Sequence, residues 1–134
     1  MKKYLFVFVA LMVLGTLILT SCGSDSAEGP AVPAAYAGKE NPFSGDAAAV
    51  EAGKKLYEAR CASCHGNTGG GDGPAAASLD PKPSALNQGQ AADYLFYRIS
   101  EGGGMAPFNS SMPASKGILS DDEIWQLVTY IQSF

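Results

Sequence analysis

The sequence has few of the side chains that usually hold structural metals, since it contains one histidine and only three cysteines among 134 residues. A structural zinc site needs about four ligands, and the histidine with the two cysteines that lie outside the N-terminal leader leaves such a site incomplete. Internal repeats and the alternating apolar pattern of β-strands are also absent. A thioredoxin-like cysteine pair requires a βαβ context, which is therefore missing too.

Basic residues are fewer than acidic ones, with 9 lysines and arginines against 13 aspartates and glutamates. Two of the lysines, Lys2 and Lys3, stand at the N-terminus, so the rest of the chain is more acidic still. An acidic domain is not expected to bind nucleic acid and should favour neutral or basic docking faces on its partners.

Two of the three cysteines and the histidine gather in one pentapeptide, Cys61-Ala62-Ser63-Cys64-His65, which has the spacing of a c-type haem attachment site. Two thiols three positions apart on one helical turn can reach the two vinyl groups of a porphyrin and form thioethers. His65 then lies under the ring plane and offers an imidazole nitrogen to the iron. The motif therefore predicts one covalently bound haem c per chain, held by Cys61 and Cys64 and ligated by His65.

The N-terminus predicts export. Lys2 and Lys3 precede an apolar run over residues 4–19, and small residues follow before Cys22, as in a signal peptide. The run is short for a membrane span of about 20 residues. Because Cys22 resembles the lipidated cysteine of the bacterial lipobox, residues 1–21 are predicted to be a lipoprotein signal peptide and Cys22 the lipidation site. The alternative is an uncleaved anchor; either way the protein would be membrane-anchored on the periplasmic or extracytoplasmic side.

Two further segments follow from composition. Residues 22–43 are rich in Gly, Ser, Ala and Pro and poor in bulky apolar side chains, which predicts a lipid-anchored flexible linker. Residues 44–134 remain as one small domain, the expected haem domain. A chain of this size has a thin core, to which a buried haem would add a large apolar body.

Apolar periodicity and capping signals predict three helices and an all-α fold. The helices are expected at about residues 47–60, at about residues 91–101 and from Ser120 onward, with residues 66–90 as a loop. Ser44 or Asp46 would cap the first, and Ser120 with Glu123 would form a capping box on the third. Their expected apolar contacts are Val50, the Lys54 stem, Tyr57 and Cys61; then Leu95, Phe96 and Ile99; then Ile124, Leu127, Val128 and Ile131.

With these residues, the chain resembles a class I monohaem cytochrome c over nearly all of residues 44–134. In that family a glycine and an aromatic residue ahead of the first haem cysteine pack against the C-terminal helix. Gly53 and Tyr57 occupy those positions, and Leu127 and Tyr130 match their partners. A glycine inside a helix otherwise costs about 1 kcal/mol relative to alanine. The resemblance implies three to four helices packed around one covalent haem.

The resemblance also implies the surroundings of the iron. A proline carbonyl should accept a hydrogen bond from the ligand histidine, either at Gly73-Pro74 or within residues 80–83. Met112, followed by Pro113 and Ala114, resembles the family's ligand segment in sequence and in its distance from Leu119. Met105, which follows three glycines, is the rival for the sixth ligand position.

Iron with both axial positions filled has no vacancy for a small-molecule substrate, so we expect an electron-transfer protein and not an enzyme. It would carry single electrons between respiratory or photosynthetic redox proteins outside the cytoplasmic membrane, as a monomer. A first alternative is a fixed electron-transfer subunit of a membrane-bound redox complex. A second is an open-site haem peroxidase or sensor, which would require both Met112 and Met105 to lie away from the iron.

Overall fold

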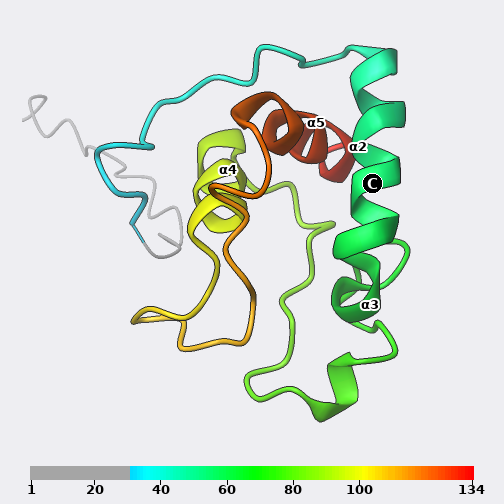
Figure 1. The fold of residues 1–134 in the computed structure, drawn as a ribbon, viewed down its shortest axis with the longest axis vertical. Helices are drawn as coiled ribbons and strands as arrows, with labels where there is room; N and C mark the ends of the chain where they lie inside the picture. Colours follow the sequence, from blue (N-terminus) through cyan, green and yellow to red (C-terminus); the bar gives the residue numbers. More distant parts are fainter. Residues whose placement is uncertain (1–30) are drawn as a thin grey trace, which may run out of the picture.

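The computed structural model describes residues 31–134, so the expected signal peptide and the lipidation site at Cys22 lie outside the described residues. Helices follow one another along this part of the chain (Figure 1). They are α2 (Ala47–Arg60), α3 (Ala62–His65), the 3-10 helix η1 (Ala76–Ser78), α4 (Ala92–Glu101) and α5 (Asp121–Ile131). Residues 31–134 contain no strand, and the predicted all-α class is confirmed. None of these helices is both long enough and apolar enough to cross a bilayer.

The first turns of α2 and α5 are capped by predicted residues, and of the two candidates for α2 the cap is Asp46 and not Ser44. The Asp46 side chain accepts a hydrogen bond of 2.8 Å from the Ala48 backbone nitrogen at the start of α2. At the start of α5, the Glu123 backbone nitrogen donates to Ser120 Oγ and the Glu123 carboxylate accepts from the Ser120 backbone nitrogen. Both caps satisfy backbone donors that the first helical turn leaves free.

The buried side of α2 differs in part from the one expected. Its buried residues are Ala49, Gly53 and Tyr57, which are spaced four apart, whereas Val50 is half-buried and Lys54 is exposed. Residues four apart lie above one another on a helix. Ala49, Gly53 and Tyr57 therefore form the buried face of α2, and the helix is turned by about one position from the predicted orientation.

Helices α2 and α5 cross in close contact at Gly53, as the family resemblance implied. A Cβ atom on Gly53 would overlap the backbone of Gln126 and would come within 2.9 Å of Tyr130 Cβ. Beside this crossing the Tyr57 and Tyr130 rings pack with centroids 5.3 Å apart. Only glycine allows the two helix backbones this approach.

The core joins α2, α4 and α5. Phe96 of α4 stacks on Trp125 of α5 with ring centroids 4.1 Å apart. The buried core residues are Tyr57, Leu95, Phe96, Ile99, Leu119, Ile124, Trp125, Leu127, Val128 and Ile131. All the apolar positions predicted for α4 and α5 are among them, so the interpretation of both helices is confirmed.

Residues 33–43, which we call the strap, run around the outside of α4 and α5 before α2 begins (Figure 1) and are hydrogen-bonded to both helices. Asn41 Nδ2 donates to Thr129 Oγ1 of α5 over 2.9 Å, and the Gly38 backbone nitrogen donates to Asp93 Oδ2 of α4 over 2.9 Å. Tyr36 packs on the ring of Tyr97 with centroids 5.2 Å apart. This differs from the flexible linker expected over residues 22–43, because the few large side chains of the strap make contacts that composition alone does not reveal.

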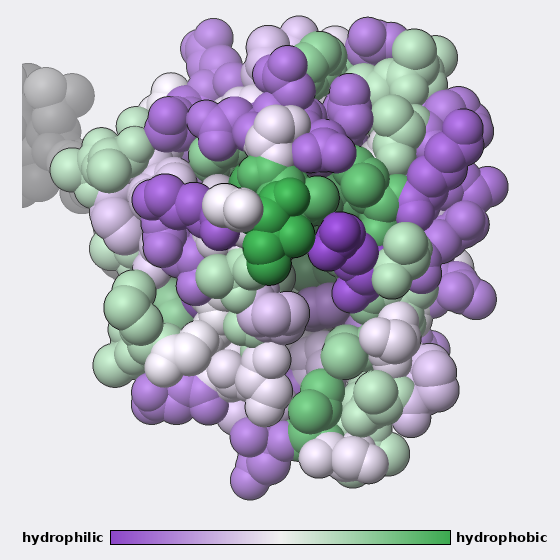
Figure 2. All heavy atoms as spheres, viewed as in Figure 1, coloured by the Kyte–Doolittle hydropathy of each residue, from purple (hydrophilic) through white to green (hydrophobic). Residues whose placement is uncertain are grey.

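Two long connections, residues 66–91 and 102–120, extend to the same end of the molecule, away from the crossing of α2 and α5 (Figure 1). The face seen in Figure 2 is hollowed near its centre, where hydrophobic residues gather, while its upper and right-hand margins are mainly hydrophilic. The predicted haem attachment motif lies at the start of the first connection, and both candidate methionine ligands lie in the second.

Candidate functional site

The pentapeptide forms a tight turn directly after α2. The backbone nitrogens of Cys64 and His65 both donate to the Cys61 carbonyl, over 3.1 and 2.9 Å, so the three residues lie on one helical turn. Cys61 and Cys64 are free thiols and both are half-buried. Tyr57 ties this turn to α2, because its hydroxyl donates to the Gly66 carbonyl over 2.8 Å. The sequence thus places both thiols and the imidazole together, as predicted.

The Cys61 thiol does not have the character of a reactive or metal-binding cysteine. Burial raises the pKa of the Cys61 thiol to about 11, whereas reactive and metal-binding cysteines need a lowered pKa. Within residues 31–134 no three His, Cys, Asp or Glu side chains are grouped so that they could hold a metal ion. Two free thiols beside an imidazole remain available for thioether formation.

The His65 ring is fixed by the backbone of Ser84. Its Nδ1 atom lies 3.1 Å from the Ser84 carbonyl oxygen, and a carbonyl can only accept, so Nδ1 carries the proton and Nε2 keeps its lone pair. Burial lowers the pKa of His65, against the opposing effect of this hydrogen bond. The ring is therefore held neutral, with Nε2 available to a metal.

The acceptor of this hydrogen bond is not a proline carbonyl, so the prediction for Gly73-Pro74 is wrong. The prediction for residues 80–83 is wrong by one position, because Ser84 directly follows Pro83. Gly73 instead packs on α3: a Cβ atom there would lie 2.6 Å from the Ser63 carbonyl carbon. The Gly73 backbone nitrogen donates to the Cys64 carbonyl over 3.1 Å. This glycine thus holds the loop against the attachment turn, and the His65 ring meets its acceptor further along the loop, at Ser84.

The two methionines differ in their surroundings. Met112 is half-buried and packs against the core cluster, whereas the Met105 side chain is 62% exposed. The loop arms that carry them pair with each other, since Gly103 N donates to the Met112 carbonyl over 2.9 Å and Ser110 N donates to the Gly103 carbonyl over 2.7 Å. Burial therefore favours Met112 over Met105 as an inward-facing ligand.

Arg98 of α4 also holds this loop, a role the sequence did not reveal. Its guanidinium lies 3.2 Å from the centroid of the Phe108 ring and donates to the Gly102 carbonyl over 2.9 Å. A cation over an aromatic face is stabilised by the ring quadrupole. From the sequence, an arginine in the last turn of a helix is expected to interact with the carbonyls at the helix end. Its contact with the Phe108 ring could not be predicted in this way.

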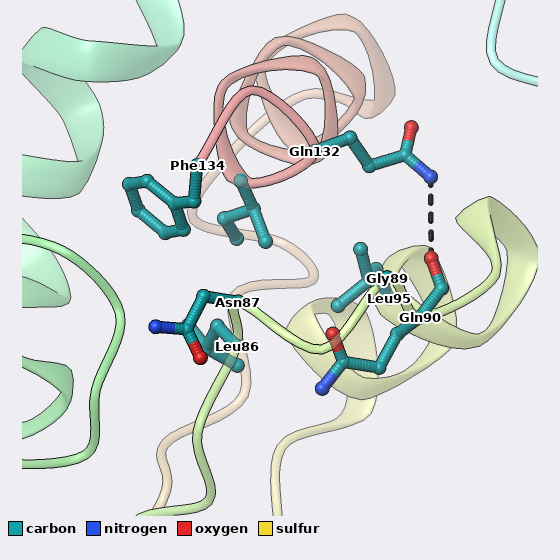
Figure 3. Close-up of a pocket in the computed structure, with 8 residues that line it drawn as sticks. Leu86, Asn87, Gly89, Gln90, Leu95, Gln132 and Phe134 are labelled. Atoms are coloured by element: carbon teal, nitrogen blue, oxygen red, sulfur yellow. Dashed lines mark hydrogen bonds between the residues drawn. The ribbon is translucent and has the colours of Figure 1, made fainter.

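A separate pocket of about 200 Å³ lies between the first connection, α4 and the end of α5 (Figure 3). Its apolar lining is Leu86, Leu95, Ile131 and Phe134, and its polar lining is Asn87, Gln90 and Gln132. Gln132 Nε2 donates to the Gln90 backbone carbonyl over 3.3 Å across it. Neither the two thiols nor the candidate axial ligands line this pocket, whose volume is below the range of about 300–1,000 Å³ typical of ligand sites.

Comparison with known proteins agrees with this geometry. Residues 50–134 match the cytochrome c family. The chain belongs to the cytochrome c family. It is 34% identical over 80 residues to cytochrome c6 of Leptolyngbya boryana, an alignment that covers 60% of this chain and 86% of that protein.

A solved structure is also similar: a chain of the reducing HAO-like protein complex of Kuenenia stuttgartiensis, with a TM-score of 0.55 and 31% sequence identity. The match covers 65% of this chain and 44% of that one, so this cytochrome spans less than half of the solved chain.

This cytochrome is therefore a class I monohaem c-type cytochrome that transfers electrons, and its family binds haem c covalently. The donor side chains of this cytochrome fit that group. They comprise two free thiols, a neutral imidazole with one free nitrogen, and a half-buried thioether.

Proposed function

We propose that Cys61 and Cys64 bind one haem through thioethers and that His65 and Met112 are its axial ligands. The observation that carries this assignment is the His65 ring, held at Nδ1 by Ser84 with Nε2 free, on the same turn as two free thiols. When bound, haem supplies an iron atom that gains and loses single electrons.

The chain's own residues keep the ligands in place between oxidation states. Ser84 fixes the tautomer and orientation of His65. Met112 is held by pairing with Gly103 and by packing on the core. A thioether ligand favours the ferrous state and raises the potential relative to a second imidazole. Ligands held on both sides leave no position for oxygen or peroxide, which favours an electron carrier over an open-site peroxidase or sensor.

The cofactor assignment is tested by extraction of the mature protein with acidified acetone. Haem joined through two thioethers should stay with the polypeptide, whose mass should exceed that of the chain by one haem. The Cys61→Ala and Cys64→Ala variants should each retain at most one thioether, and the double variant should lose its haem to the solvent. Complete loss of haem from the wild-type protein would contradict the assignment.

We further propose that the protein is exported and anchored through lipid on Cys22. The leader pattern in residues 1–21, followed by Cys22, supports both parts of this proposal, and the similarity to cytochrome c6 supports export alone. Its partners would be redox proteins on the periplasmic or extracytoplasmic side, a donor and an acceptor. Neither nucleic acid nor a small-molecule substrate is expected to bind.

A second candidate, a fixed subunit of a membrane-bound redox complex, is favoured by one observation: the similar solved chain belongs to a protein complex. Membranes of the native host, solubilised in mild detergent and separated by native electrophoresis, distinguish the two by haem staining. A mobile carrier should migrate near its monomer mass, and a subunit should migrate with larger proteins.

A further inference from the structure

The strap contacts both ends of the loop that carries Met112. Its Tyr36 hydroxyl donates to Glu101 Oε1 at the end of α4. Lys116 follows Met112 on the arm of the loop that returns to the core. Its Nζ atom donates to the same Glu101 oxygen over 2.9 Å and to the Tyr36 hydroxyl over 3.4 Å. One cluster of three side chains, Tyr36, Glu101 and Lys116, therefore joins the two places where the loop leaves and re-enters the helical core. We call it the clasp.

Backbone hydrogen bonds next to the clasp close the same loop. Lys116 N donates to the Ser100 carbonyl over 3.0 Å, and Ser115 N donates to the Ile99 carbonyl over 3.0 Å. Further along, Gly103 N bonds to the carbonyl of Met112 itself. To move Met112 away from the core, the arms must separate from each other and from the end of α4, which the clasp opposes.

An ion pair alone would hold these arms weakly. The Lys116 side chain is 66% exposed, and exposed ion pairs contribute little because solvent screens them. Tyr36 differs because its ring is packed against Tyr97 and Phe96, with centroids 5.2 and 6.1 Å apart. Tyr97 in turn lies 6.5 Å from Phe108 on the loop. The aromatic ring thus anchors the hydroxyl at the clasp.

From this arrangement we propose that Tyr36 is a positioning residue for the axial ligand Met112, acting through Glu101 and Lys116. The proposal rests on the assignment of Met112 under Proposed function. It gives a role in the electron-transfer site to the strap, which precedes the residues that match the family. Burial raises the pKa of Tyr36, as does its hydrogen bond to Glu101, so the hydroxyl keeps its proton and donates at neutral pH.

If Tyr36 holds the loop closed, its hydroxyl should slow the rate at which the Met112 loop opens. An added ligand such as imidazole can reach ferric iron only after the Met112 sulfur has left it, so at saturating imidazole the binding rate measures how often the loop opens. The test compares the ferric holoprotein with Tyr36→Phe, which keeps the ring and removes the hydroxyl. The matched control is Tyr94→Phe on α4, a tyrosine that is half-buried like Tyr36 and whose hydroxyl has no hydrogen-bond partner among the described residues.

We expect Tyr36→Phe to raise the limiting rate of imidazole binding about 2- to 10-fold, the factor that corresponds to loss of one hydrogen bond, while Tyr94→Phe leaves it unchanged. Chemical denaturation of the same proteins provides the second readout. A merely structural role would lower resistance to denaturant without changing the imidazole rate, and that result would overturn the proposal.

The same measurements distinguish failure of the Tyr36 proposal from failure of the assignment of Met112 as the axial ligand. If the wild-type ferric protein lacks the near-infrared sulfur-to-iron band, Met112 is not the ligand and both proposals are overturned. If the band is present and Tyr36→Phe binds imidazole at the wild-type rate, the ligand assignment stands and only the role of Tyr36 is rejected.

Discussion

Gly53 of α2 and Tyr130 of α5 lie so close that a Cβ atom on Gly53 would come within 2.9 Å of Tyr130 Cβ and would overlap the backbone of Gln126. Gly53→Ala should therefore lower the free energy of unfolding by about 1–3 kcal/mol through overpacking, although alanine is by about 1 kcal/mol the better helix former. Denaturant titration of the holoprotein measures the change.

The control for this variant is its neighbour Lys54→Ala. Lys54 is exposed on the same helix, so its replacement should change the free energy of unfolding by less than about 0.5 kcal/mol. A Gly53→Ala protein as stable as the Lys54→Ala protein would show that the two helices can move apart at no cost.

Met112→Ala and Met105→Ala form the second matched pair. Met112 is half-buried against the core and Met105 is mostly exposed, so only Met112→Ala should abolish the near-infrared sulfur-to-iron band of the ferric protein. The same variant should lower the reduction potential, because the iron loses a ligand that favours the ferrous state. Absorption spectra and redox titration measure both quantities, and the reverse pattern would assign the ligand to Met105.

The sequence predicted best what local interactions determine. Asp46 and the Ser120–Glu123 pair are caps that act within a few residues, and both helix starts were predicted correctly from them. The attachment motif was likewise readable, because its chemistry depends on spacing along one turn. Gly53 could be interpreted only through the family resemblance, since a lone glycine in a helix has no local explanation.

Contacts between distant backbone atoms could not be predicted in the same way. The acceptor for His65 is a main-chain carbonyl, which every residue has, so the identity of Ser84 carries no signal. The composition of the strap, dominated by small residues and proline, predicts a linker, whereas its docking depends on the single side chains Tyr36 and Asn41. Such contacts depend on the three-dimensional arrangement of α4 and α5.

Cys22→Ser tests the predicted lipid anchor. Wild-type protein from the native host should partition with membranes and be released only by detergent, because two acyl chains bind a bilayer far more firmly than one. The variant should lack the lipid, while its haem spectrum is unchanged. Mass spectrometry of the mature N-terminus decides the matter, and a chain that still begins at Met1 would identify residues 4–19 as the anchor.

Acid should loosen the clasp between Glu101, Tyr36 and Lys116. The hydrogen bond from Tyr36, followed by that from Lys116, lowers the pKa of the Glu101 carboxyl in the folded protein. A group whose pKa is lowered by folding stabilises the native state above its ordinary value of about 4.3, and this contribution disappears as the pH falls through the folded value. Wild-type protein should therefore be more stable than Glu101→Gln at neutral pH.

This difference between wild type and Glu101→Gln should shrink below about pH 4, as measured by denaturant titration at a series of pH values. Part of the acid sensitivity should remain in the variant, because the backbone hydrogen bond from Ser120 also lowers the pKa of Glu123 in the capping box. In a Tyr36→Phe background the difference at neutral pH should be smaller, since the largest cause of the Glu101 shift has been removed. A gap between wild type and Glu101→Gln that stays constant from neutral to acidic pH would mean that ionisation of Glu101 makes no net contribution to the free energy of unfolding.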